Sequence, residues 1–192
     1  MIKAEFFVQL IGASFFLILN IYLVKHGFSD PEIANFISYR FLAVMLLAFP
    51  LGFYIKGKPL KPFFILGSLG VPIIAILLVL AVEFNWHQYL PLLFILWGIF
   101  FTSFQVSSLP YVMRNTISKN QSHAISLNYA THSFGTILSG IIIFGFGKFM
   151  QEINEGVILL FISCLGFFGI YHLLKIKVDI VVPLEKGLNW KS

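Results

Sequence analysis

The stretch NFISYRFLAVMLLAFPLGFYIKGK, residues 35–58, decides the fold class, because it places a long apolar run between a polar start and a basic end. About 20 apolar residues, at ~1.5 Å of rise per helical residue, cross the ~30 Å hydrocarbon core of a bilayer. One charged side chain, Arg40, lies inside the run. A charge in a membrane-spanning segment is costly unless it has a partner or faces a wet cavity, so Arg40 is a first candidate functional residue.

The rest of the chain has the same apolar character. Of its 192 residues, 58% are hydrophobic, 11% are charged and 23 are phenylalanine. A water-soluble domain of this size cannot bury so much apolar surface. The apolar residues form long blocks rather than alternating ten-residue strands, which favours helices over a β-barrel. The sequence therefore predicts an all-α integral membrane protein.

Six blocks are long enough to span a bilayer. They cover residues 6–24, 33–55, 63–82, 90–112, 124–146 and 157–174. We expect one six-helix transmembrane bundle over 1–174, followed by a polar cytoplasmic tail, 175–192, that begins a central loop. The first block exceeds the apolar core of a signal peptide and no small-x-small cleavage site follows it, so we expect it to stay in the mature chain.

The basic residues predict the orientation, because short loops rich in lysine and arginine are retained on the cytoplasmic side. With the N-terminus inside, ten of the 13 basic residues fall on the cytoplasmic side and only Lys25 and Lys148 fall outside. Both termini are then cytoplasmic. The net charge of +5 belongs to a membrane face and gives no reason to expect nucleic-acid binding. A multi-pass protein of a cell membrane is expected, and a bacterial inner membrane fits.

Two roles are open for Arg40. Its long side chain can extend to the outer headgroups, which would be a structural role. It can also bind an anionic group or hold an outer gate, because buried charges in membranes usually face the bundle interior.

A polar stripe marks the fifth predicted span. Asn128, His132, Gly135 and Ser139 recur at spacings of four, three and four, so they share one helix face. Glycine and serine on such a face allow close helix packing. The imidazole of His132 titrates near neutral pH and could instead relay protons or bind substrate, so packing and function are both open for it.

Three of the other amides within predicted spans are Gln9 and Asn20 in the first span and Gln105 in the fourth. A buried primary amide needs several hydrogen-bond partners, which distinguishes Gln9 and Gln105 from serine and threonine, whose hydroxyls can bond their own helix carbonyls. No catalytic residue, metal site or cofactor is expected, because the H-E-x-x-H pattern, a glycine-flanked serine opposite a histidine and a glycine-rich phosphate loop are all missing from the sequence. The one cysteine, Cys164, excludes a disulfide within the chain.

Two stretches resemble the major facilitator superfamily of transporters. The second span ends in PLGFYIKGKPLK, residues 50–61, where Gly52 precedes the basic loop Lys56, Gly57 and Lys58; this is similar to the superfamily's loop between helices two and three. The order WGIFFTSFQVSSLPYVMRN, 97–115, then HAISLNYATHSFGTILSG, 123–140, resembles its helix four, basic inner loop and helix five. Lys56 stands where members commonly have aspartate, and 90–98 lack the arginine of many proton-coupled members, so proton coupling stays open.

The resemblance implies the N-terminal half of a secondary transporter, which moves a small solute by alternating access. A second six-helix half, downstream or on another subunit, would complete it, and each half would hold two inverted three-helix units. Helices one and four would line the cavity, which by analogy gives Gln9, Asn20 and Gln105 a role in binding, and the Gly52–Lys58 loop would latch one conformation. Arg40 suits an anionic solute and an aromatic lining suits a hydrophobic one. The alternative is a non-transporting membrane subunit or receptor, and an intramembrane enzyme is a more distant one.

Overall fold

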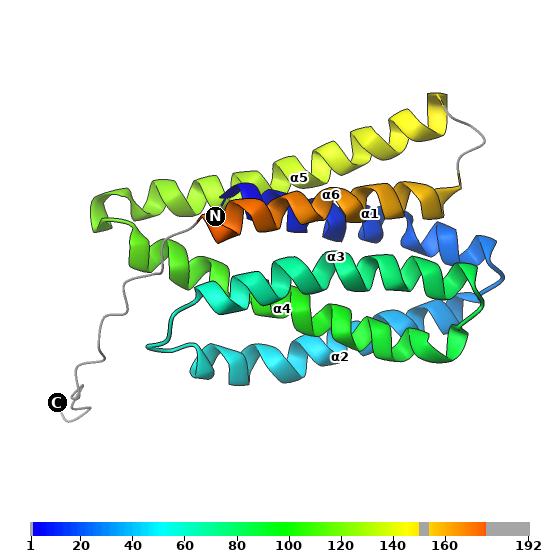
Figure 1. Cartoon of the computed structure of the whole chain (residues 1–192), viewed down its shortest axis with the longest axis horizontal. Helices are drawn as coiled ribbons and strands as arrows, with labels where there is room; N and C mark the ends of the chain where they lie inside the picture. The colour runs from blue at the N-terminus through cyan, green and yellow to red at the C-terminus, as the bar shows by residue number, and fades with distance from the viewer. Residues whose placement is uncertain (1, 150–153, 176–192) are drawn as a thin grey trace.

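The structure, a computed structural model, describes residues 2–149 and 154–175, and within them the chain runs up and down a bundle of α-helices (Figure 1). The helices are α1 (Ile2–Lys25), α2 (Asp30–Tyr54), α3 (Lys61–Glu83), α4 (Leu90–Asn115), α5 (Gln121–Phe149) and α6 (Glu155–Leu174). Single 3₁₀ turns, η1 (His87–Tyr89) and η2 (Ser118–Asn120), precede α4 and α5. The described part of the chain contains no β-strand, and all six helices are long and apolar enough to cross a membrane. The prediction of an all-α, six-helix membrane protein is confirmed.

The helices are longer than the predicted spans at most of their ends, because the polar flanks continue the helical backbone. The first helix shows the consequence most clearly. It begins at Ile2, whereas the predicted span begins at Phe6. Glu5 therefore lies inside α1 rather than in a leading loop. Residues 176–192, most of the predicted cytoplasmic tail, lie outside the described residues.

The start of α2 shows how local sequence sets a helix end. Ser29 precedes the helix with extended backbone, and both its backbone N–H and its hydroxyl donate hydrogen bonds to the Glu32 carboxylate, at 2.9 and 2.7 Å. Pro31 occupies the first turn, where a missing N–H costs nothing. The acidic side chain also interacts favourably with the positive end of the helix dipole.

The packing of the helices repeats between the two halves of the chain. α1 packs mainly against α5 and α6, while α4 packs mainly against α2 and α3, and α3 and α6 pack against each other. If α1, α2 and α3 are exchanged with α4, α5 and α6 in that order, the same main helix pairs are in contact. α2 and α5 are the least buried of the six helices.

The core is built from large side chains and from glycines that let backbones approach. Trp97 on α4 is fully enclosed and packs edge-on against Phe15 of α1, with ring centroids 5.0 Å apart. The next residue, Gly98, faces α2 so closely that an added Cβ would lie 2.5 Å from the carbonyl oxygen of Arg40. Only glycine fits there without moving one of the helices.

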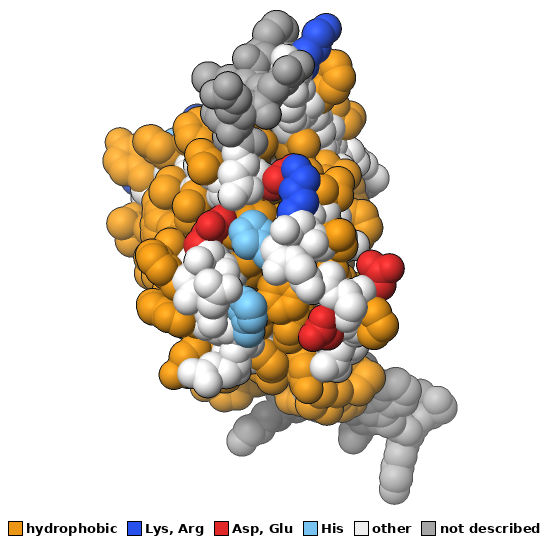
Figure 2. Space-filling view, turned by 90° about the vertical axis from the view of Figure 1, so that its right-hand side faces the viewer, with side chains coloured by type: hydrophobic (Ala, Val, Ile, Leu, Met, Phe, Trp, Pro, Cys, Tyr) orange, Lys and Arg blue, Asp and Glu red, His pale blue; other side chains and the backbone are white. Residues whose placement is uncertain are grey.

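The two ends of the bundle differ in charge. The N-terminus and the end of α6 lie at the same end, together with the α2–α3 and α4–α5 connections (Figure 1). The described basic residues at that end are Lys3, Lys56, Lys58, Lys61, Arg114, Lys119 and Lys175. Figure 2 looks onto the opposite end, where acidic, basic and histidine side chains gather among hydrophobic ones.

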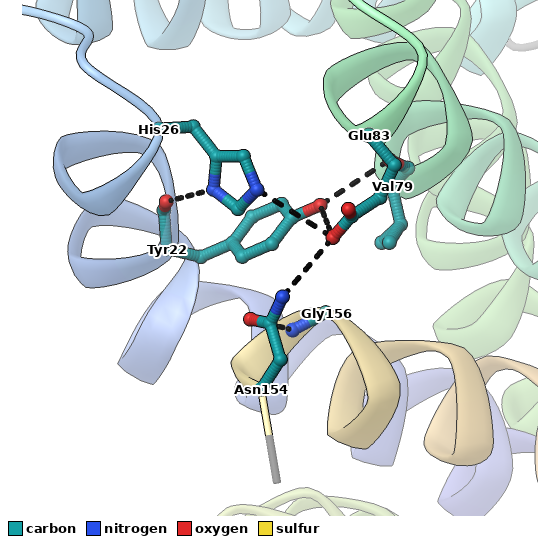
Figure 3. Close-up of polar contacts among 6 residues, drawn as sticks. All are labelled: Tyr22, His26, Val79, Glu83, Asn154 and Gly156. Carbon is teal, nitrogen blue, oxygen red and sulfur yellow. Dashed lines mark hydrogen bonds and ion pairs between the residues drawn. The ribbon is translucent and has the colours of Figure 1, made fainter. Parts of the chain in front are cut away.

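A polar cluster ties three helices together at this second end (Figure 3). The Tyr22 hydroxyl of α1 lies 2.9 Å from the Glu83 carboxylate of α3 and 3.3 Å from the Val79 carbonyl. His26 approaches the same carboxylate oxygen at 3.5 Å, and the Asn154 amide donates to it at 3.3 Å from the residue that caps α6. The cluster therefore fixes the ends of α1, α3 and α6 relative to one another.

Candidate functional site

A polar pocket of about 250 Å³ opens between α1, α4 and α5. We call it the Glu5 pocket. Its lining residues are Glu5, Gln9, Gln105, Ser108, Leu109, Asn128, Tyr129 and His132. Most of them are polar, although the helices that carry them are apolar enough to span a membrane. Polar side chains within such helices usually mark a substrate or ion pathway.

Four of the six candidates named from the sequence meet in this pocket: Gln9, Gln105, Asn128 and His132. Gln9 and Asn128 are buried, whereas Gln105 and His132 are exposed at its opening. The site therefore has a closed inner wall and an accessible rim. The residues of the pocket come from three helices, so no single predicted span contains the whole site.

The sequence reasoning named neither Ser108 nor Glu5 among the pocket residues. Glu5 was missed because the first predicted span started one residue after it. Only 4% of its surface is exposed. The available signal was its spacing from Gln9, since residues four apart lie on the same face of a helix. A carboxylate one turn before an intramembrane amide could have been recognised as part of the same polar face.

A chain of hydrogen bonds connects the three helices at the back of the pocket. The Ser108 hydroxyl of α4 donates to Glu5 Oε2 of α1 at 3.0 Å, and Asn128 Nδ2 of α5 donates to the Ser108 oxygen at 3.1 Å. The other end of the Asn128 amide, Oδ1, is buried without a hydrogen-bond partner. An unpartnered buried acceptor is costly, so this oxygen is a ready contact for a ligand.

The other two candidates, Asn20 and Arg40, line a separate pocket of about 110 Å³ between α1, α2 and α4. The Arg40 guanidinium carbon lies 4.2 Å from the centre of the Trp97 ring and 5.2 Å from that of Phe101. Phe101 lies one turn further along α4 than Trp97, toward the end of the bundle that holds the α4–α5 connection. The Arg40 side chain therefore packs on aromatic faces between the helices, and its Nε is buried without a partner.

The polar stripe of α5 divides between two environments. Asn128 and His132 face the Glu5 pocket, while Gly135 and Ser139 face α1. The Ser139 hydroxyl donates to the Leu10 carbonyl at 3.0 Å. The second pair therefore packs helices together, and only the first pair contributes to the site.

The basic loop after α2 is held by a residue to which the sequence reasoning gave no role. Arg114, at the end of α4, donates hydrogen bonds to the Lys58 carbonyl at 2.7 Å and to the Ile55 carbonyl at 3.2 Å. Gly57 between them has φ +72°, a conformation that favours glycine. Of the predicted latch residues, Gly52 lies in α2, and Lys56, Gly57 and Lys58 form this loop.

Larger hollows on the bundle are apolar. One of about 700 Å³ is lined by Ile65, Leu66, Leu69 and Ile73 of α3 with their neighbours, and others lie beside α2 and between α1 and α5. Such surfaces suit lipid chains. Within the described ranges, no group of three or more histidine, cysteine or acidic side chains could hold a metal ion.

No protein-family model matches the chain, and no curated protein matches it either.

Proposed function

We propose that the chain is a six-helix half of a secondary membrane transporter of the major facilitator type, which moves a small solute by alternating access. The observation that carries the proposal is the Glu5 pocket, because it places a buried carboxylate and several amides between helices long enough to cross a membrane. A bundle that only anchors a protein does not need such groups in its interior, where each is costly.

The repeated packing pattern supports this proposal. α1 packs against α5 and α6 in the same way that α4 packs against α2 and α3. Two three-helix units with opposite orientation produce such a pattern, and transporters built of inverted repeats place their substrate site where the units meet. The Glu5 pocket, shared by helices of both units, is at such a boundary.

The arrangement of the pockets indicates where a second half would bind. α1 and α4 line both pockets, while α5 completes the Glu5 pocket and α2 completes the Arg40 pocket. α2 and α5 are also the least buried helices. A second six-helix half, on the same chain or another subunit, would cover this face and enclose the solute between the two halves.

The charged ends support a specific orientation and a latch. The basic end that holds the N-terminus would face the cytoplasm, in a cell membrane such as a bacterial inner membrane. Arg114 and the 55–58 loop would hold α2 and α4 together in one conformation and separate in the other. His132, at the opening of the pocket, is the candidate for proton coupling.

Cysteine accessibility tests alternating access without knowledge of the solute. In a Cys164→Ala background, Gln105→Cys places a thiol at the opening of the Glu5 pocket. A membrane-impermeant maleimide should label it when added to either side of the membrane, because the pocket opens to each side in turn. Phe144→Cys is the control, because Phe144 lies on the outside of α5 with 67% of its surface exposed and should react from neither side.

The alternative of a non-transporting subunit or receptor predicts a different result. A static bundle would label Gln105→Cys from one side only, or from neither. That result would reject alternating access and leave the pocket as a fixed binding site.

A further inference from the structure

We propose that the Glu5 pocket binds the ammonium group of an organic amine. This inference rests on the proposed transport function and names the substrate class of the transporter. Glu5 is almost fully buried, and no lysine or arginine in the described chain forms an ion pair with it; the ion pairs seen there join Lys25 to Glu155 and His26 to Glu83. A buried carboxylate without an ion-paired side chain is unfavourable, and a bound cation supplies the missing partner.

The hydrogen bonds determine which ligand groups fit. A serine hydroxyl has one hydrogen, and that of Ser108 is directed to Glu5 Oε2. The Ser108 oxygen must then accept from the Asn128 amide nitrogen, which turns Asn128 Oδ1 away from the hydrogen-bond chain and leaves it unpartnered. Glu5 Oε1 also keeps its accepting capacity. Both groups are acceptors, so the complementary ligand is a positively charged donor.

The size and rim of the pocket favour an organic amine over a metal ion. A volume of about 250 Å³ is roughly eight times the ~30 Å³ that one water occupies in the liquid. A bare cation needs oxygens packed around it at ~2.3–2.6 Å, which a hollow of this size does not offer. Tyr129 and His132 line the same pocket and are exposed, so their rings can contact an ammonium group.

The same hydrogen-bond chain makes a proton a competitor for the amine. If Glu5 is protonated, it can donate to Ser108, Ser108 can donate to the oxygen of a turned Asn128 amide, and Asn128 then presents its nitrogen to the pocket. The negative charge and the acceptor are lost together. Other titratable groups near Glu5 are Tyr129 and His132 of α5, in the same pocket, and Lys3 of α1 with His172 of α6, in a neighbouring one.

The test uses radiolabelled benzylamine and the purified full chain in lipid nanodiscs, with binding measured by equilibrium dialysis. Benzyl alcohol, which has the same shape and no charge, should compete at least tenfold less well than unlabelled benzylamine. Glu5→Gln should weaken benzylamine binding at least tenfold, and Ser108→Ala should weaken it by a smaller factor. Asp30→Asn, at the opposite end of the bundle, is the control, because Asp30 is exposed, and it should bind as the unmodified chain does.

Equal competition by benzylamine and benzyl alcohol, or unchanged binding to Glu5→Gln, overturns the proposal. If Glu5→Gln does not fold, the unmodified chain still tests it, because acidification should displace benzylamine and a pH-independent affinity contradicts the assignment. Failure of amine binding is distinct from failure of transport. Two-sided labelling of Gln105→Cys without amine binding would reject the amine site and keep the transporter proposal. Amine binding with one-sided labelling would keep the amine site and reject alternating access.

Discussion

Glu5 and Ser108 lie 103 positions apart in the chain, yet their side chains share a 3.0 Å hydrogen bond inside the bundle. This bond joins α1 to α4, the first helices of the two repeated units. Asn128 extends it to α5. The polar pocket therefore depends on how three helices are packed, and substitutions that change this packing should change the site as well as the stability of the bundle.

Gly98→Ala should destabilise the bundle by ~1–3 kcal/mol, because the added Cβ would lie 2.5 Å from the Arg40 carbonyl oxygen and 3.0 Å from the Ala43 side chain. A backbone oxygen cannot move aside as a side-chain end can. Gly140→Ala is the control, since nothing lies within 4 Å of its Cβ position. Thermal unfolding in detergent should show a lower midpoint for Gly98→Ala alone, and equal midpoints would refute the close contact.

Arg40 and Trp97 should show a coupling energy of ~0.5–2 kcal/mol in a double-mutant cycle, because the guanidinium lies over the indole ring at 4.2 Å. The cycle uses Arg40→Met, Trp97→Leu and the double variant, with unfolding in detergent as the measurement. The control cycle combines Arg40→Met with Trp86→Leu and should show no coupling, because Trp86 is exposed. An additive Arg40–Trp97 cycle would mean that the stacked geometry contributes nothing.

Tyr22→Phe should lower the stability of the bundle by ~1.5–3 kcal/mol, because it removes the hydroxyl that bonds the Glu83 carboxylate at 2.9 Å. Tyr89→Phe is the matched control at the same end, where half of the Tyr89 surface is exposed. Chemical unfolding of both variants in detergent checks the difference. A Tyr22→Phe protein as stable as Tyr89→Phe would show that the cluster does not fix the helix ends.

Arg114→Gln should free the loop after α2, because it removes the guanidinium that bonds the Lys58 and Ile55 carbonyls. The measurement is trypsin cleavage after Lys56 in membrane vesicles with the basic end outward; proline follows Lys58 and Lys61, so Lys56 is the susceptible site of this loop. Cleavage should become several-fold faster. Lys119→Gln, at the same end, should leave the rate unchanged, and an unaffected Arg114→Gln rate would argue against the latch.

The proposed orientation can be checked with single cysteines in the Cys164→Ala chain. Lys58→Cys lies at the basic end and Trp86→Cys at the other, and both parent side chains are exposed. An impermeant maleimide added to intact cells should label Trp86→Cys and spare Lys58→Cys, since the basic end is expected inside. The reverse labelling pattern would show that the basic end faces the outside of the cell.

The sequence alone determined the class of the protein, the number of helices and many of the polar residues of interest. These features are local, because bilayer thickness sets the length of an apolar run and any polar side chain within one is conspicuous. The capping of α2 by Ser29 and Pro31 is likewise local chemistry. Gln105 and His132 could be selected for the same reason.

Only the tertiary structure decided how these residues are grouped. It joins Gln9 to Asn128 in one pocket, places Arg40 in another, and brings in Glu5, which preceded the first predicted span. It also turns the Arg40 side chain onto Trp97. The physical reason is that hydropathy is a property of each segment by itself, whereas a pocket forms from the side chains of different helices, whose relative rotation is set by contacts between residues far apart in the chain.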